Sequence, residues 1–295
     1  MRTIAEVKSF VKGRTYLERK PNFSIRIPTL YLLLIIVSIV VLSPILWALS
    51  TSLKTEKQVQ AYPPSMIPRP VTFESYYTLF AKTSIPRYLL NSTIVAVFTV
   101  AVTLLIASIA AYPFARSNFP GKELLFFLVL AFMMIPGLTN LIPLYIMMSS
   151  LHLLNSYTAL VIMYSGWNIP FAVWLMRGFI EVIPKELDEA ASIDGCKRFG
   201  AFMRIIVPLS TPGLAATGII VFINSWNEFL VALTFTSSNE IRTMPVGIYL
   251  FQNYYGVEWG MLMASSIVSC LAVVVFFLIL QKRLIAGLTQ GAVKH

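Results

Sequence analysis

The sequence predicts an all-α polytopic membrane protein with six transmembrane helices, and its composition and hydropathy are the first evidence. Of the 295 residues, 57% are hydrophobic and 12% are charged, and the mean hydropathy is +0.75. Soluble domains carry about 25% charged residues, so this composition indicates a membrane protein. Lipid offers no hydrogen-bond partners to exposed backbone groups, so the apolar runs are expected to be helices.

Six apolar runs are each long enough to span a bilayer, and none has Lys or Arg in its central part. A spanning helix needs about 20 residues. The first run exceeds the roughly 7–15 apolar residues of a signal peptide, so we interpret it as an uncleaved span. The runs cover residues 27–49, 89–112, 124–148, 158–177, 210–235 and 259–281. The polar segment 50–88 contains four prolines between residues 63 and 70 and is too broken to cross.

Prolines are expected to interrupt several spans. Pro44 should kink the first, Pro136 and Pro143 bracket Gly137 in the third, and Pro170 lies within the fourth. Interrupted membrane helices persist where neighbouring helices or a water-filled cavity satisfy the freed carbonyls. The cluster in the third span therefore favours a lined cavity, and a packing role is the alternative for each proline taken alone.

The basic residues set the orientation, because cytoplasmic loops carry an excess of Lys and Arg. Of the 23 Lys and Arg, 17 lie on one side of the predicted spans, in segments 1–27, 113–123, 177–209 and 281–295. We therefore expect both termini to be cytoplasmic. The predicted organisation is a cytoplasmic segment 1–27, a six-helix domain 28–281 with a cytoplasmic loop 178–209, and a cytoplasmic tail 282–295.

The loop 178–209 is predicted to hold two short helices, and we call it the coupling hairpin. Pro184 suits the start of the first helix, and three acids in its first turn oppose the positive end of the helix dipole. Leu187, Ala190 and Ala191 form one narrow face at helical spacing. Gly195 supplies the turn, because glycine readily takes positive φ after a helix.

The second helix is predicted from an apolar stripe at i, i+3, i+4 and i+7. The stripe consists of Phe199, Phe202, Met203 and Ile206. Pro208 and Pro212 are expected to end this helix. A pair of short helices joined by a glycine can act as a docking knob, and an ordinary amphipathic pair at the membrane surface is the alternative.

The coupling hairpin resembles the "EAA" loop of the membrane subunits of binding-protein-dependent ABC importers. The matching residues are Glu189, Ala190, Ala191, Asp194, Gly195, Ile205, Val207 and Pro208. The resemblance implies that this loop is cytoplasmic and seats in a cleft of an ATPase subunit. Residues 287–295 resemble the C-terminal ending of sugar-transporter permeases, with His295 in place of the usual glycine, and segment 63–80 resembles their first outer loop. Together these features are similar to the MalG-type subunits of the carbohydrate-uptake group.

The fifth span carries the candidate translocation pathway. Asn224, Trp226, Asn227 and Glu228 combine an aromatic ring with amides and the one acid of the spans. A ring face can pack on the apolar side of a sugar while amides bind its hydroxyls, and an ionisable group in a span usually faces protein or water. The alternative is that Glu228 lies near the outer interface, with Trp226 as a residue of the aromatic belt.

The resemblance implies several partners: a second permease subunit, two ATPase subunits and an extracytoplasmic solute-binding protein, in a bacterial or archaeal cytoplasmic membrane. No Gly-x-x-x-x-Gly-Lys-Ser/Thr loop for phosphates occurs, so we expect ATP and Mg²⁺ on the ATPase subunits and no cofactor on this chain. No catalytic site or metal-ligand cluster is predicted. Nucleic acid is not an expected partner, since the basic residues are divided among loops.

The alternatives to an importer subunit are a transporter or channel that works alone and a membrane-bound enzyme or scaffold. A secondary transporter or channel would work alone and often shows inverted repeats and buried charges for a coupling ion, but the sequence shows no convincing repeat and only Glu228 within a span. A membrane-bound enzyme or scaffold would need a site that the sequence does not supply.

Overall fold

The computed structural model describes the backbone of residues 26–253 and 256–292. By internal contacts the chain divides into two units, Met1–Trp47 and Ala48–His295. The described part is helical apart from a small antiparallel pair of strands, β1 (Gln252–Asn253) and β2 (Gly256–Val257), in which Gln252 pairs with Val257. The predicted all-α class is confirmed.

The first predicted span forms one helix, α2 (Arg26–Ser52), which extends from the first unit into the start of the second. Pro44 lies inside this helix and does not end it. The apolar side chains between Leu30 and Leu46 are exposed around the whole helix. A helix that is apolar on every side needs an apolar surrounding, and lipid provides one.

Within the described residues, four helices are long and apolar enough to cross a membrane. They correspond to the first, second, fourth and sixth predicted spans. Their bounds are Pro28–Ser52, Ile85–Arg116, Tyr157–Glu181 and Trp259–Gln281. The helices that contain the last three are α5 (Ile85–Arg116), α8 (Tyr157–Glu181) and α15 (Trp259–Ala292). The expected interruption of the fourth span at Pro170 is wrong, because α8 continues through this buried proline and packing holds it in place.

The third predicted span is interrupted, as expected. Helix α6 (Lys122–Ala131) is followed by two short 3₁₀ turns, η1 (Phe132–Met134) and η2 (Gly137–Asn140), and then by α7 (Leu141–Ser150). The break surrounds Pro136, which lies outside any helix. Pro143 lies in the first turn of α7 and causes no break, since the missing N–H is not needed there.

The fifth predicted span is not one continuous helix. Helix α12 (Thr211–Asn227) ends before Glu228, and α13 (Leu230–Phe235) begins after Phe229. The prediction of a single helix over 210–235 is therefore wrong at this point, because Glu228 adopts extended backbone angles and its side chain serves the next helix, as described below.

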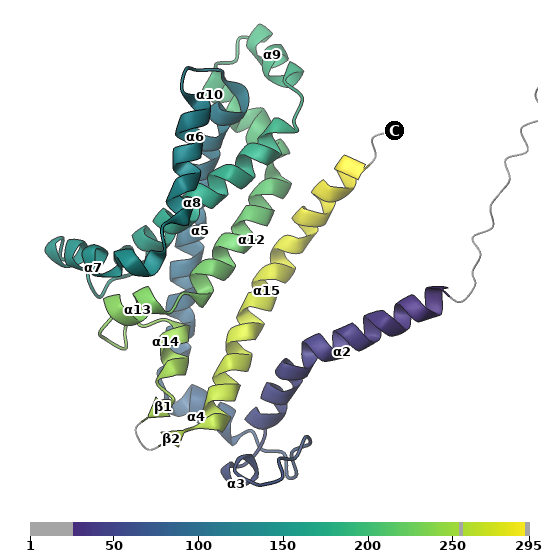
Figure 1. Cartoon of the computed structure of the whole chain (residues 1–295), viewed down its shortest axis with the longest axis vertical. Helices are drawn as coiled ribbons and strands as arrows, with labels where there is room; N and C mark the ends of the chain where they lie inside the picture. Colours follow the sequence, from purple (N-terminus) through teal and green to yellow (C-terminus); the bar gives the residue numbers. More distant parts are fainter. Residues whose placement is uncertain (1–25, 254–255, 293–295) are drawn as a thin grey trace, which may run out of the picture. The chain divides into compact units, whose positions relative to one another are not determined.

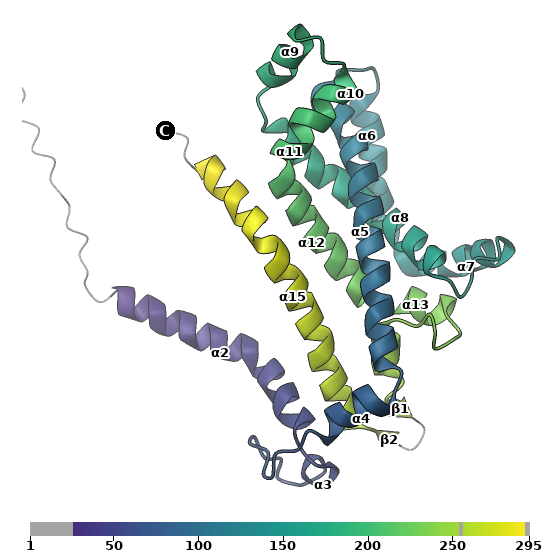
Figure 2. The ribbon, with the colours of Figure 1, turned by 180° about the vertical axis from the view of Figure 1, so that it is seen from behind.

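The helices of the second unit run beside one another. In both views, α5, α8, α12 and α15 are elongated along the unit, with α9 (Glu186–Ile193) and α10 (Arg198–Ala201) at one end (Figures 1 and 2). We call this the hairpin end. The opposite end carries α4 (Glu74–Lys82) and the two strands, and we call it the loop end. The polar segment after α2 also contains α3 (Glu56–Val59), and α14 (Met244–Tyr249) precedes the strands.

Small side chains bring the central helices close together. The buried face of α5 includes Ala96, Thr99, Thr103, Ala107 and Ala111, which follow one side of the helix toward α8 and α12. Small residues let membrane helices approach through their backbones, where packing replaces the hydrophobic effect that lipid does not supply. At the junction of α8 and α12, a Cβ on Gly213 would lie 2.4 Å from Phe179, so only glycine fits.

Candidate functional site

The first helix of the coupling hairpin forms where the sequence predicts it. Helix α9 begins two residues after Pro184 and carries Glu186, Asp188 and Glu189 in its first turn. Ala191 is its buried residue, while Leu187 and Ala190 are exposed. The narrow face predicted from the spacing is therefore open at Leu187 and Ala190, and the acids Glu186 and Glu189 of the same helix are also exposed.

Gly195 ends α9 with the predicted conformation. Its φ is +76°. The amide of Cys196 donates to the carbonyl of Ala191 at 2.8 Å, and the amide of Gly195 donates to that of Ser192 at 3.1 Å. These two bonds define a Schellman motif, which needs the left-handed conformation at the glycine. Asp194, the last residue before the glycine, is exposed.

The second helix of the hairpin departs from the prediction in two respects. Helix α10 continues into a π-helical turn, η3 (Phe202–Ile206), and then α11 (Val207–Leu209). The predicted apolar stripe is also divided: Phe202 and Ile206 are buried, whereas Phe199 and Met203 are exposed.

The prolines of this region do not act as expected either. Pro208 lies in the first turn of α11 and does not end the helix, and Pro212 opens α12. Between these helices, at Ser210, the chain bends by 74°. The hairpin therefore meets α12 at a sharp angle.

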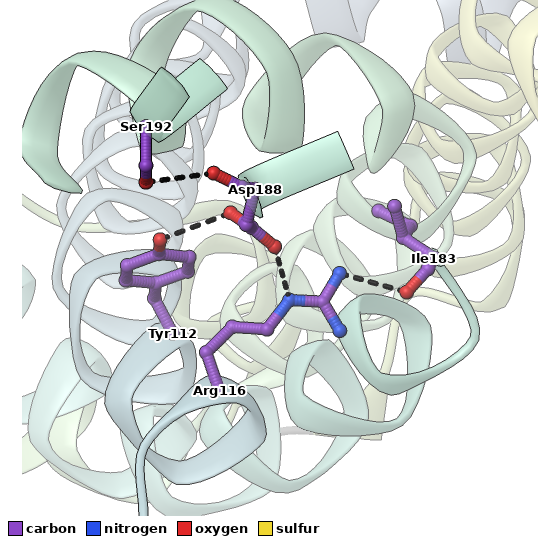
Figure 3. A network of polar contacts seen from close by, with 5 residues as sticks. All are labelled: Tyr112, Arg116, Ile183, Asp188 and Ser192. Carbon is purple, nitrogen blue, oxygen red and sulfur yellow. Dashed lines mark hydrogen bonds and ion pairs between the residues drawn. The ribbon is translucent and has the colours of Figure 1, made fainter. Parts of the chain in front are cut away.

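A charged network attaches the hairpin to the end of α5 (Figure 3). The Asp188 carboxylate forms an ion pair with Arg116, at 2.8 Å from Nε, and accepts a hydrogen bond from the Tyr112 hydroxyl at 3.1 Å. The Arg116 guanidinium also donates to the carbonyl of Ile183 at 2.8 Å. The Ser192 hydroxyl donates to the backbone carbonyl of Asp188 at 2.9 Å.

This ion pair is largely removed from water, since the Arg116 and Asp188 side chains are 7% and 19% exposed. Arg116 thereby joins the last turn of α5, the turn after α8 and helix α9. Beside it lies a cleft of about 340 Å³ whose wall also includes Lys185 and Arg198. Removing one partner of a buried pair is strongly destabilising, so the contact fixes α9 on α5.

Sequence reasoning missed Tyr112, Arg116 and Asp188. Asp188 was assigned to the helix dipole alone, and Arg116 was counted only as a basic residue of an inner loop. Tyr112 and Asp188 are 76 positions apart. A lone arginine at the end of an apolar span was the available signal, but the partner of its charge depends on how the helices pack.

The predicted pathway residues lie in different surroundings. Trp226 is 1% exposed; its ring stacks on Phe222 at 5.4 Å and its Nε1 donates to Ser269 at 3.0 Å. Both its ring and its N–H are therefore used inside the unit. Asn224 and Asn227 are exposed, and Asn224 donates to Asn168 on α8 at 2.9 Å.

Glu228 caps a helix in this structure. Its carboxylate accepts the backbone amides of Val231 and Ala232 at 2.9 and 3.1 Å, at the start of α13. It also accepts the Tyr164 hydroxyl at 2.7 Å. A carboxylate at a helix N-terminus satisfies amides that have no partner within the helix.

The break before α13 adjoins another ring that the sequence analysis did not single out. Trp167 on α8 is 37% exposed. With Gly137, Leu141 and Glu228, it lines a cavity of about 190 Å³. Gly137 lies so close that a Cβ on it would be 3.3 Å from the Trp167 ring. Two interrupted spans thus adjoin this cavity.

Metal-ligand chemistry has no evident site in the described residues, since no group of three or more His, Cys, Asp or Glu lies together there. Cys196 and Cys270 are free thiols. The tail 282–295, including the ending that resembles sugar permeases, lies outside the residues whose side chains the structure describes.

Comparison with known proteins gives a consistent result. The family described as "Binding-protein-dependent transport system inner membrane component" matches residues 103–286. The chain is 40% identical over 253 residues to the sulfoquinovosyl glycerol transport system permease protein of Agrobacterium fabrum, covering 86% of this chain and 89% of that one. It is 36% identical over 263 residues to the trehalose/maltose transport system permease protein of Thermococcus litoralis, covering 88% and 94%.

A solved structure has a similar fold. It is a bacterial ABC transporter involved in the import of the acidic polysaccharide alginate, and the TM-score is 0.73 with 20% sequence identity. The similarity covers 96% of this chain and 98% of that chain. At 20% identity, this similarity shows a shared fold and nothing further.

The Gly195 turn generates a prediction about the hairpin. Gly195→Val should destabilise the turn by about 1–2 kcal/mol, because a residue with a Cβ is strained at positive φ, whereas Gly195→Asn should cost less, since asparagine tolerates this conformation. No atom lies within 4 Å of a Cβ placed there, so the effect is conformational rather than steric. Hydrogen exchange of the α9 amides should be faster in the valine variant than in the asparagine variant. Equal protection in both would contradict this account.

Proposed function

The chain belongs to the family of inner membrane components of binding-protein-dependent transport systems, and we propose that the solute it helps to import is a carbohydrate. As a permease subunit of an ABC importer it is a multi-pass protein of the cytoplasmic membrane. The observation that carries the carbohydrate assignment is similarity over most of its length to permeases named for sugar-containing solutes. The family consists of non-catalytic permease subunits, which argues against a transporter or channel that works alone.

The proposed complex contains a second permease subunit, two ATPase subunits and an extracytoplasmic solute-binding protein. ATP and Mg²⁺ bind to the ATPase subunits, and this chain binds no cofactor. The sequence supports this division, because it lacks the glycine-rich phosphate loop of such ATPases. Binding of ATP closes the ATPase pair, and the coupling hairpin carries this movement to the spans.

The coupling hairpin is the proposed ATPase-docking surface. The residues proposed for docking are Glu189, Ala190, Ala191, Asp194, Gly195 and Pro208. The exposed positions of α9 support the assignment: Glu189 and Ala190 are exposed, and Ile193, at 87% exposure, is a large apolar side chain at the surface. An exposed apolar group beside small residues suits burial by a partner.

A docking test follows from Glu189. Glu189→Lys should weaken binding of the ATPase subunits, because it reverses a charge on the exposed surface near the positive end of α9. In proteoliposomes, we expect ATP-dependent carbohydrate uptake to fall at least about tenfold, which corresponds to about 1.4 kcal/mol. Glu181→Lys, an exposed acid at the end of α8, is the control. Full uptake by the Glu189 variant would remove the hairpin from the mechanism.

The wild-type complex tests the substrate class itself. Uptake should require ATP, the binding protein and a sugar, and an unrelated solute such as an amino acid should not support it. Carbohydrate-independent stimulation of the ATPase with no sugar uptake would reject the proposed substrate.

The proposed orientation places both termini and the coupling hairpin in the cytoplasm. Segment 1–27 is then an inner segment, residues 28–281 form the transmembrane domain with its inner loop 178–209, and residues 282–295 form an inner tail. The excess of Lys and Arg on this side supports the orientation.

Cysteine labelling measures this orientation. In a variant whose native cysteines are replaced by alanine, Ser65→Cys should react with an impermeant thiol reagent in intact cells, whereas Asn118→Cys should react only after the membrane is opened. Both positions are exposed in the structure, so accessibility within the fold does not separate them. The reverse pattern would overturn the orientation.

The proposed pathway runs past the break between α12 and α13. Asn224 and Asn227 remain candidate contacts because they are exposed. Trp167 is a better aromatic surface than Trp226, because its ring borders a cavity while that of Trp226 is packed inside the unit. Glu228 would act indirectly, by holding α13 at the edge of this cavity.

Two tryptophan variants distinguish these roles. Trp167→Ala should reduce carbohydrate uptake while ATP hydrolysis stimulated by the loaded binding protein persists. Trp226→Ala should instead reduce the amount of assembled complex, because removing a buried tryptophan costs about 3–5 kcal/mol. Uptake, stimulated ATPase activity and subunit yield are measured together. Wild-type uptake in the Trp167 variant would remove that ring from the pathway.

A further inference from the structure

Helix α5 is held by polar contacts at both of its ends. At the loop end, Asn91 is fully buried, and its side-chain amide donates to the carbonyls of Glu240 and Arg242, each at 2.8 Å. The Tyr88 hydroxyl donates to Asn239 at 2.8 Å. The hydroxyl of Ser92 accepts a hydrogen bond from the backbone amide of Met244 at 2.7 Å.

These contacts all reach one segment, residues 239–244, which comprises the later part of the connection from α13 and the first residue of α14. The buried Asn91 amide holds both carbonyls at once, and the Glu240 carbonyl also accepts from Arg87 Nε at 3.4 Å and from the Tyr157 hydroxyl at 3.3 Å. We call this set of contacts the outer joint. It attaches the segment to the first two turns of α5.

At the hairpin end, Arg116 and Tyr112 hold Asp188 on α9. We call these contacts the inner joint. Both joints lie on one continuous helix, since α5 has 32 residues and is about 48 Å long at 1.5 Å per residue. Pro113 lies in its last turns without ending it.

The inner joint has a mechanical consequence for the hairpin. The chain itself attaches the hairpin at two places, to α8 through residues 182–185 and to α12 through the bend at Ser210. Two attachments allow rotation about the line that joins them. The contact with α5 is a third attachment, on a different helix, and three attachments that do not lie on one line fix an orientation.

We propose that α5 is the strut that links the outer segment 239–244 to the coupling hairpin, with Arg116 and Asp188 as positioning residues. This inference rests on the proposed function. When the ATPase subunits move the hairpin, the inner joint requires α5 to follow, and the outer joint requires the segment to follow α5. Conversely, a binding protein that displaces the outer segment biases the position of α9.

The experiment uses the complete complex in proteoliposomes and measures the ratio of ATP hydrolysis with and without loaded binding protein. Asp188→Asn and Arg116→Gln should each lower this ratio by between about 5- and 150-fold, the usual range of coupling between two sites. Asn91→Ala should lower it as well, although it lies at the opposite end. The charge reversal Arg116→Asp with Asp188→Arg should recover part of the ratio.

The matched control is the ion pair between Arg177 and Glu181. It is also at the hairpin end, with 2.7 Å between Nε and Oε1, but both residues belong to α8 and do not attach the hairpin to another helix. Glu181→Gln should therefore leave the ratio within about twofold of wild type, since the Glu181 side chain is 44% exposed and exposed i, i+4 pairs contribute little. Arg177 keeps its contacts with Glu123 and Phe126 on α6 in this variant.

A double variant tests whether α5 acts as one strut. If both joints serve one connection, breaking either already uncouples the ends, so Asn91→Ala with Asp188→Asn should be no worse than the more severe single variant. Independent effects would multiply instead, and that result would overturn the proposal. So would unchanged ratios in the single variants while the subunits still co-purify.

A milder variant covers the case in which Asp188→Asn loses its partner subunits. Tyr112→Phe removes one hydrogen bond to Asp188 and keeps the ion pair. If Asp188→Asn fails to assemble, the phenylalanine variant should assemble and show a smaller fall in the ratio, and an unchanged ratio would reject the inner joint. If the wild-type complex shows no stimulation at all, the proposed function fails rather than the strut.

Discussion

The structure depends on one constraint, that backbone polar groups surrounded by lipid must find partners within the protein. This constraint turns the apolar runs into helices and restricts where they can stop. At the break before α13, the Glu228 carboxylate takes two of the amides that the interruption exposes. At the end of α9, which lies in the hairpin and not in a span, the Schellman bonds around Gly195 satisfy carbonyls that the helix leaves without partners.

Charged side chains then define the ends of the spans. A buried charge favours an oppositely charged partner, because an isolated charge away from water is costly. The Arg116–Asp188 pair is the main example, and it joins two segments that are distant in the sequence. Because of this pair, α5 holds the hairpin in addition to the two helices that precede and follow the hairpin in the chain.

Interrupted helices shape the proposed pathway. The breaks in the third and fifth predicted spans adjoin one cavity, with Trp167 on its wall. Continuous helices pack on one another through small residues, whereas a break brings larger side chains and backbone ends into the same space. Asn168 and Asn224 place an amide pair between α8 and α12. Membrane proteins accommodate irregular backbone where it is buried in protein or lines a cavity.

Sequence reasoning correctly predicted the features that depend on local chemistry. The apolar runs, the interrupted third span, the acidic first turn of α9 and the positive φ of Gly195 all follow from residue type and spacing. The predictions failed where a longer-range contact decided the outcome. Pro170 does not break α8, because that proline is buried against its neighbours. The fifth span is not continuous, because Glu228 finds Tyr164 and the amides of α13.

By itself, the sequence determined a helical membrane protein with a two-helix hairpin whose motif indicates an importer subunit. Hydropathy and glycine geometry act over a few residues, so they can be read along the chain. The tertiary structure decided that Trp226 is packed inside, that Trp167 borders a cavity, and that Asp188 pairs with Arg116 rather than only opposing a dipole. Those outcomes depend on which helix faces which, and a contact such as that of Tyr112 with Asp188, 76 positions apart, is not encoded in local spacing.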